Sequence, residues 1–218
     1  MVNESWTQAE RTPFSMRFCP KCGGRVESVV PSGDDRVRAV CSSCGEVHYK
    51  NPTMVVGCLV EAADGILLCR RSIEPGYGLW TLPAGFQELN EGLIEGACRE
   101  TREEACADVE VTAPHAFIDI PHVGQGYAIF RASLCGSERP QPGDETLETA
   151  FVQPGDLPWK DIAFPAVSFA LRFFVDDLKD SKRRVHHATL RLRAMGKRFD
   201  VDSYDVVGHQ SFPLGEGC

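Results

Sequence analysis

The stretch GFQELNEGLIEGACRETREEACAD, residues 85–108, holds seven carboxylates against only two arginines. Within it Leu93, Ala97, Thr101 and Ala105 recur every four residues, which is the period of a helix with one packed face. We therefore predict a helix that ends near Ala105 and buries this face against the rest of the protein.

Three of the carboxylates form a cluster on another face of the same helix. Glu100, Glu103 and Glu104 stand at positions i, i+3 and i+4. Like charges at these spacings destabilise a helix by about 0.2–0.5 kcal/mol per pair unless a cation lies between them. Carboxylate oxygens suit hard divalent cations such as Mg²⁺ or Mn²⁺. The cluster predicts a divalent-metal site, and a solvated acidic face is the alternative.

A second metal pattern lies nearer the N-terminus. Cys19, Cys22, Cys41 and Cys44 form two C-x-x-C pairs with eighteen residues between them, a spacing typical of zinc sites made of four thiolates. Alternating residues on either side of the PSGDD turn predict two short strands between the pairs. Four thiolates leave no open coordination position, so we expect structural zinc rather than direct binding of substrate or RNA.

The order of residues in the acidic stretch is that of a known family. Gly85, five residues, Glu91, seven residues and then RETREE resemble the Nudix box, G-x5-E-x7-R-E-U-x-E-E-x-G-U, where U is a bulky aliphatic residue. Three positions depart from it: Thr101, Cys106 and Ala107. Because a cysteine adopts the left-handed conformation of a glycine helix cap only at a cost, Cys106 predicts a change in the local loop geometry.

The resemblance implies a role for each residue of the box. Glu100, Glu103 and Glu104 would bind the catalytic Mg²⁺ or Mn²⁺ with the Gly85 carbonyl close by, and Glu88 would lie near the metals. Glu91 would pair with Arg99 and join the loop of the box to its helix, which is a structural role. Relatives also carry a further acid for positioning water, and Glu148 in PGDETLETAF matches it, with a solvated loop acid as the alternative.

The resemblance extends from Cys19 to about Leu178, since one branch of the family carries a zinc ribbon before the Nudix domain. It implies an α/β fold, the Nudix α/β/α sandwich with a mixed sheet. The organisation we predict is an N-terminal tail (1–18), a zinc ribbon (19–50), a Nudix hydrolase domain (51–178) and a C-terminal basic extension (179–218). Relatives often form homodimers, although no interface is evident in the sequence.

The expected reaction is hydrolysis of the pyrophosphate bond of a nucleoside diphosphate linked to a group X, because clustered divalent metals bridge phosphate oxygens and activate water. The segments CPKCGG, YKNPTMVVGCLVE, GLWTLPAGF and DIP are most similar to the FAD pyrophosphatase group, which cuts FAD into FMN and AMP. The S-Q-P-W-P-F-P-x-S array of NADH pyrophosphatases is absent. ADP-ribose hydrolases carry a proline that Pro121 matches, so ADP-ribose is the alternative to FAD.

Aromatic residues near the box offer rings for stacking on the substrate. Trp80, Phe86, Phe117 and Tyr127 are the candidates, and packing in the core is the alternative for each. The six histidines show no spacing typical of catalysis or of metal binding, so we predict no role for them.

The charge of the chain reverses near its C-terminus. The net charge is −8, which argues against nucleic acid as a partner of the whole chain. Residues 179–198, however, hold eight Lys or Arg and one Asp, which predicts a solvated extension or, alternatively, a surface for RNA or an acidic protein on a non-catalytic Nudix scaffold. No apolar run reaches the ~18 residues of a membrane span. We expect a cytoplasmic protein, or a plastid protein if a transit peptide has been removed.

Overall fold

The computed structural model describes residues 16–136 and 139–215. The chain divides into two compact units, of which the first ends at Asn51 and the second begins at Pro52. No helix in the described ranges is long and apolar enough to cross a membrane.

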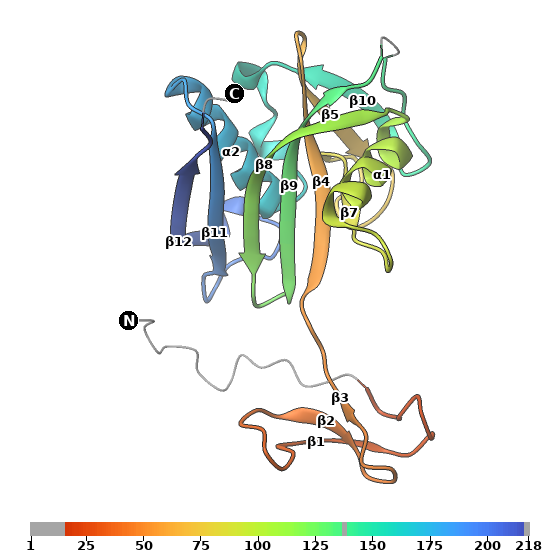
Figure 1. Cartoon of the computed structure of the whole chain (residues 1–218). Coiled ribbons are helices and arrows are strands. Elements are labelled where there is room, and N and C mark those ends of the chain that lie inside the picture. The colour runs from red at the N-terminus through yellow and green to blue at the C-terminus, as the bar shows by residue number, and fades with distance from the viewer. Residues whose placement is uncertain (1–15, 137–138, 216–218) are drawn as a thin grey trace. The chain divides into compact units, whose positions relative to one another are not determined.

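The first unit is a small antiparallel sheet (Figure 1). Cys19 and Cys22 precede its first strand, and Cys41 and Cys44 lie at the end of its second strand and just after it. Its strands are β1 (Val26–Val29), β2 (Arg38–Cys41) and β3 (Val47–His48), paired in the order β1-β2-β3. The turn between β1 and β2 is the PSGDD segment, where Asp34 Oδ1 accepts hydrogen bonds from the backbone N–H groups of Asp35 and Arg36.

The second unit is built on a mixed sheet, in which nine strands pair within the described residues. The path β10-β5-β4-β9-β8-β11-β12 runs across it, with β6 beside β5 and β7 beside β4. The pairs β4–β9 and β8–β11 are parallel and the others are antiparallel. The strands are β4 (Thr53–Ala62), β5 (Gly65–Arg71), β6 (Trp80–Thr81), β7 (Ala84–Phe86), β8 (Val109–Ile120), β9 (Gln125–Leu134), β10 (Thr146–Val152), β11 (Arg184–Leu192) and β12 (Tyr204–Pro213).

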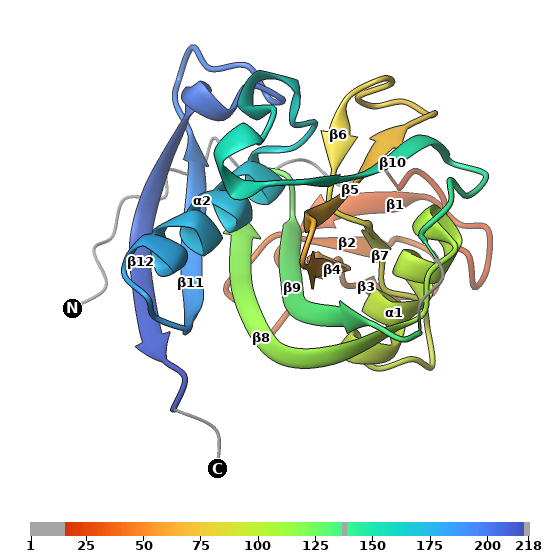
Figure 2. The ribbon, with the colours of Figure 1, turned by 90° about the horizontal axis from the view of Figure 1, so that it is seen from above.

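The helices α1 (Leu93–Ala105) and α2 (Pro165–Lys179) pack on opposite faces of this sheet, with strands between them (Figure 2). Short 3-10 helices lie at η2 (Pro154–Asp156), η3 (Trp159–Asp161) and η4 (Val201–Ser203). Strand β4 shows why both faces are covered. Val55 and Leu59 belong to the core that contains α2, whereas Val56 and Val60, on the other face, pack in the core that contains α1. The predicted Nudix α/β/α sandwich is confirmed.

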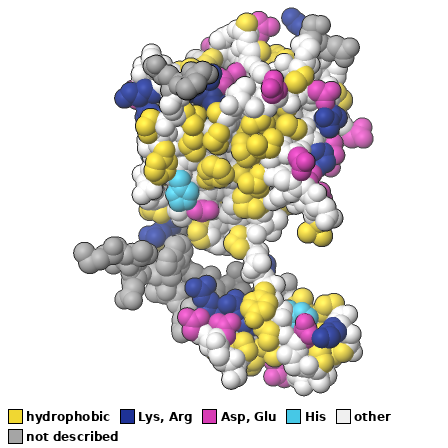
Figure 3. Space-filling view, in the orientation of Figure 1, with side chains coloured by type: hydrophobic (Ala, Val, Ile, Leu, Met, Phe, Trp, Pro, Cys, Tyr) yellow, Lys and Arg dark blue, Asp and Glu magenta, His cyan; other side chains and the backbone are white. Residues whose placement is uncertain are grey.

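Helix α1 begins and ends close to the positions that the sequence predicts. The Glu95 side chain accepts a hydrogen bond from the Gly92 N–H at 2.7 Å and so caps the first turn. The helix ends before Cys106, whose φ of 48° is left-handed. Acidic and basic side chains gather at the edge of the molecule where α1 lies, next to apolar side chains over the strands (Figure 3).

The prediction of a solvated C-terminal extension is wrong for the segment that follows α2. β11 pairs in parallel with β8, and β12 pairs with β11, so both strands belong to the same sheet as β4. His186, Ala188 and Leu190 alternate as buried residues of β11. The basic residues of this part of the chain hide the alternation in the sequence. Several of them form ion pairs with acids, as Arg193 does with Asp205 at 2.9 Å.

Candidate active site

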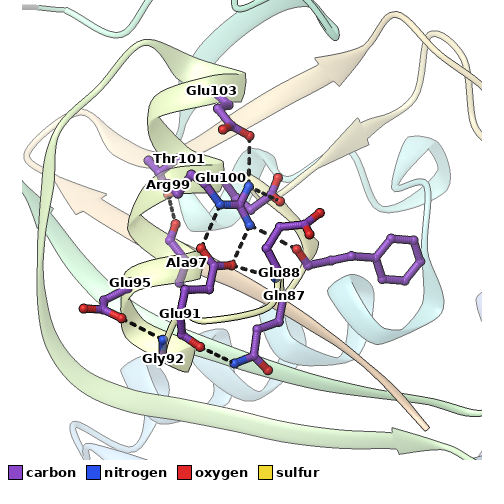
Figure 4. Close-up of polar contacts among 11 residues, drawn as sticks. Gln87, Glu88, Glu91, Gly92, Glu95, Ala97, Arg99, Glu100, Thr101 and Glu103 are labelled. Carbon is purple, nitrogen blue, oxygen red and sulfur yellow. Dashed lines mark hydrogen bonds and ion pairs between the residues drawn. The ribbon is translucent and has the colours of Figure 1, made fainter. Parts of the chain in front are cut away.

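Arg99 is the centre of a polar network that joins the loop after β7 to α1 (Figure 4). Its Nε and Nη2 donate to the two carboxylate oxygens of Glu91 at 2.9 and 2.7 Å. Its Nη1 donates to Glu100 at 2.7 Å and to Glu103 at 2.9 Å. The hydrogen bonds from Arg99, and next the one from the Glu88 backbone N–H, lower the pKa of Glu91 to about 2. One guanidinium therefore offsets the repulsion among three carboxylates, and the predicted Glu91–Arg99 pair is present.

Glu104 is held differently from the other two acids of the cluster. It is only 6% exposed, and its Oε2 accepts a hydrogen bond from the Ala84 N–H at 3.1 Å. Burial raises the pKa of Glu104 to about 7, and burial also raises the pKa of Glu100 against the opposing effect of Arg99. Among the described residues, the cluster of side chains placed to hold a metal ion is that of the ribbon cysteines, and these three carboxylates do not form one. Arg99 holds two of them, and the backbone of β7 holds the third.

Two glycines allow this close approach of loop and helix. A Cβ atom at Gly85 would lie 2.3 Å from a carboxylate oxygen of Glu100. A Cβ atom at Gly96, within α1, would lie 2.6 Å from Glu91 Oε1 and 2.9 Å from a methyl of Val56. Any larger residue at either position would displace the acids, so the glycines fix the distance between the loop and the helix.

The acids line one side of a cleft of about 770 Å³. Of the residues that the sequence singles out, Gly85, Phe86, Glu88, Arg99, Glu100, Glu103, Glu104 and Tyr127 line it. Glu91 lies behind them, bonded to Arg99. Oxygen ligands on one wall of an open cleft fit Mg²⁺ or Mn²⁺ and leave room for a substrate beside the ion.

Three candidates lie outside the cleft lining, so their positions do not support the predicted roles. Glu148 is on β10 and is 53% exposed at its side chain, and it lies 3.5 Å from Arg70 on the neighbouring strand. Trp80 packs half-buried against the core, which is the alternative considered for it. Pro121 is exposed in the turn between β8 and β9. Tyr127 does reach the cleft, but it is also a core residue, and burial raises its pKa to about 12.

The cleft also contains residues that sequence reasoning missed. Asp144 and Glu145, from the loop before β10, line it in place of Glu148. They stand directly after the Pro-Gly pair of the same motif, which is the signal that would have found them. Other lining residues come from distant segments and have no local signal, among them Arg71, Phe164, Arg198, Phe199 and Tyr204.

Cys106 keeps the backbone conformation that the second glycine of the Nudix box would adopt. Its φ and ψ are 48° and 36°, so the expected change in the loop geometry is wrong. A non-glycine residue pays about 1–2 kcal/mol for this conformation. The backbone just before Cys106 is held by the Gln141 N–H, which donates to the Ala105 carbonyl at 2.9 Å, and by the Gly143 N–H, which donates to the Glu104 carbonyl at 3.0 Å.

The four ribbon cysteines (Cys19, Cys22, Cys41 and Cys44) converge as the sequence predicts. Their sulfurs all lie within 4.8 Å of one another, with 3.9 Å from Cys19 to Cys44 and 3.4 Å from Cys22 to Cys41. Tetrahedral zinc with Zn–S bonds of about 2.3 Å requires sulfurs about 3.8 Å apart, so the cluster fits structural Zn²⁺. His48 Nε2 lies 3.3 Å from Cys19 Sγ, a neighbour to the ligands that the sequence did not indicate.

Comparison with protein families assigns both units. Residues 17–50 match the zinc-ribbon family model described as Nudix N-terminal, and residues 51–172 match the model described as NUDIX domain. A Nudix hydrolase of known structure from Nitrosomonas europaea is 41% identical to this chain, with a TM-score of 0.76. The similarity covers 80% of this chain and 98% of that one.

The curated relatives are named for more than one substrate. A protein named NAD-capped RNA hydrolase NudC, from Vibrio atlanticus, is 28% identical over 68% of this chain and 50% of its own length. A protein named ADP-ribose pyrophosphatase, from Methanocaldococcus jannaschii, is 30% identical over 50% of this chain and 67% of its own length. The chain thus spans about half the length of the NudC protein that it matches.

Proposed function

The chain belongs to the Nudix family, and we propose that it hydrolyses the pyrophosphate bond of a nucleoside diphosphate linked to a second group. FAD, cut to FMN and AMP, is the first candidate. The observation that carries the proposal is the composition of the cleft, in which Glu88, Glu100, Glu103 and Glu104 share the lining with arginines and aromatic rings, among them Arg71, Arg198, Phe164, Phe199 and Tyr204. Carboxylates suit the metals that bind a pyrophosphate, and rings suit the groups on either side of it.

Glu100, Glu103 and Glu104 would hold Mg²⁺ or Mn²⁺, together with the carbonyl of Gly85. A divalent ion bound there would polarise phosphate oxygens and lower the pKa of a water molecule. The chain's own residues prepare the site. Arg99 holds Glu100 and Glu103 at the cleft while Glu91 anchors that arginine, and the absence of a side chain at Gly85 lets the loop lie against Glu100 of the helix.

The cleft offers further acids that are free to act on water. Glu88, Asp144 and Glu145 all line it, and they come from the two loops on either side of the cluster. We assign to them the positioning of the attacking water, which is the role that the sequence gave to Glu148, and also the acceptance of its proton. Their position in the cleft supports this assignment.

The reaction is supported by the residues of the cleft, whereas the substrate is supported by resemblance and by the names of relatives. The similarity of CPKCGG, YKNPTMVVGCLVE and GLWTLPAGF to the FAD pyrophosphatase group supports FAD. The names of the relatives favour ADP-ribose and NAD-capped RNA, and they remove the support for excluding nucleic acid as a partner. All three molecules present a nucleotide pyrophosphate to the same wall of acids.

A panel of four substrates tests the function. FAD, ADP-ribose, NADH and an NAD-capped RNA are each incubated with the full chain and Mg²⁺, and the products are separated chromatographically. We expect FMN and AMP from FAD at the highest kcat/KM. A hundredfold preference for ADP-ribose or for the capped RNA would overturn the ranking, a difference of about 2.7 kcal/mol. If none of the four is cleaved, the chain is a non-catalytic Nudix scaffold and the proposal fails.

A further inference from the structure

Part of the cleft lining comes from a segment beyond the Nudix match, which ends at residue 172. Arg198, Phe199 and Tyr204 come from the connection between β11 and β12 and its end, yet they line the same cleft as Glu100. The cleft therefore combines parts of the chain that are about a hundred residues apart.

This segment, residues 198–204, is held in place by its own hydrogen bonds. The Tyr204 hydroxyl donates to the Arg198 carbonyl at 2.8 Å. The Ser203 hydroxyl donates to Asp200 Oδ2 at 2.8 Å and accepts from the Lys197 N–H at 3.0 Å. Asp200 also caps η4 through the Asp202 N–H at 3.1 Å. A loop with this many internal bonds presents its outward side chains in a fixed arrangement.

Phe199 is the side chain that this arrangement exposes to the cleft. Phe199 has 48% of its surface exposed, which leaves a large apolar area in contact with water. One edge of its ring packs against Phe164, with the ring centroids 6.4 Å apart and the planes at 63°. The Arg198 guanidinium lies 5.3 Å from the centroid of the Phe199 ring. A ring that is fixed on one side and open on the other suits stacking by a planar ligand.

Two guanidinium groups of the cleft lining, those of Arg71 and Arg198, lie outside ion-pair distance of any acid among the described residues. Arg71 is only 9% exposed, donates to the Pro75 carbonyl at 2.8 Å and lies 5.0 Å from the centroid of the Phe164 ring. Its charge acts on the Glu104 carboxyl from beyond that distance. A phosphate in the cleft would give these cations a closer anionic partner.

We propose that Phe199, with Arg198 and Arg71, forms the specificity subsite of the cleft. It would stack on an aromatic ring of the substrate and contact the phosphate next to that ring. The inference rests on the proposed function only in taking the ligand to be a nucleotide. According to this proposal, residues 198–204, rather than the Nudix box, select the group X that is attached to the pyrophosphate.

The test measures binding of AMP and FMN, the two halves of FAD, by calorimetry in the presence of Mg²⁺. Phe199→Ala should weaken the half whose ring stacks there about tenfold, or about 1.4 kcal/mol, and leave the other half within twofold. Phe199→Trp should restore most of the lost affinity because a larger ring still stacks. Phe212→Ala is the matched control, because Phe212 is a 54% exposed phenylalanine of β12 outside the cleft lining.

The outcomes separate this subsite from the proposed activity. The proposal is overturned if Phe199→Ala binds both halves as the unchanged chain does, if Phe212→Ala weakens them equally, or if the unchanged chain binds neither. If binding responds to Phe199 but no pyrophosphate is cleaved, the subsite stands and the activity fails. If FAD is cleaved and Phe199→Ala leaves its KM unchanged, the activity stands and the subsite fails. If Phe199 has a structural role, the Phe199→Trp variant should have a lowered thermal midpoint, as should the Phe199→Ala variant.

Discussion

Replacing Glu104 by Gln should raise the stability of the protein while removing its activity. The carboxylate is 6% exposed, and burial raises its pKa to about 7 from an ordinary value of 4.5. Because the folded chain then binds this proton more tightly than the unfolded chain, the contribution of the group to stability falls as pH rises from about 4.5 through 7. Above pH 7 the ionised carboxylate costs about 3 kcal/mol of folding free energy.

The glutamine variant lacks this dependence on pH. Its amide oxygen can still accept the hydrogen bond from the Ala84 N–H, and the penalty for burying the new amide N–H₂ group is the same at every pH. The difference in unfolding free energy, variant minus unchanged chain, should therefore rise by up to about 3 kcal/mol between pH 5 and pH 8.5. Activity with Mg²⁺ should fall by about two to four powers of ten in kcat, since a metal ligand is lost.

Urea titrations at the two pH values measure the stability difference. The buffer contains no Mg²⁺ but also no chelator, because a chelator would extract zinc from the ribbon. Glu95→Gln is the matched control, since it lies on the same helix outside the cleft and a glutamine can still cap Gly92. If the difference for Glu104→Gln stays constant or falls as pH rises, the carboxylate is not held in a desolvating site. If turnover stays near normal, Glu104 is not a metal ligand.

Three further outcomes follow from other parts of the structure. Glu91→Gln should lower both the thermal midpoint and the turnover, because Arg99 loses its bidentate partner. Glu103→Gln should lower the turnover alone, so equal thermal midpoints for the two variants would contradict this prediction. Removal of zinc by a chelator should unfold the first unit and leave the unfolding transition of the second unit in place. Circular dichroism before and after dialysis measures this, and two unchanged transitions would refute the prediction. His115 is fully buried and burial lowers its pKa to about 4, so protonation favours the unfolded chain between pH 6.5 and 4. In urea titrations the free energy of unfolding should fall by about 2 kcal/mol more from pH 7 to pH 5 in the unchanged chain than in His115→Leu, and equal losses would contradict this.

The part of the site that the sequence predicts is the part that one short segment builds. Gly85, Glu91, Arg99 and the acids of α1 lie within twenty residues, so the helical period and one loop fix their distances. The four ribbon cysteines are likewise local, because each C-x-x-C pair makes its own turn. The homodimer, the compartment and the role of each site residue stay predictions.

The part that the sequence does not predict depends on pairing between distant strands. Nothing in the local pattern of residues 179–198 indicates that β11 would pair with β8, because a parallel pair has no turn to mark it and the basic residues hide the alternation. Glu148 shows the same limit at a smaller scale. The pairing of β10 with β5 places Glu148 opposite Arg70 on the sheet and leaves Asp144 and Glu145 at the cleft, a difference of a few residues that only the register decides.

The two walls of the cleft tolerate change differently, and this bears on the varied names of the relatives. A change at Gly85 or Gly96 moves acids that Arg99 ties together, so it disturbs the whole cluster. The segment 198–204 is held by bonds within itself, such as the one from the Tyr204 hydroxyl to the Arg198 carbonyl, and by bonds from Arg193 on the same connection, so its outward side chains can change without moving the acids. Proteins with the same box can therefore keep one reaction and exchange the group X, which is what relatives named for NAD-capped RNA and for ADP-ribose would require.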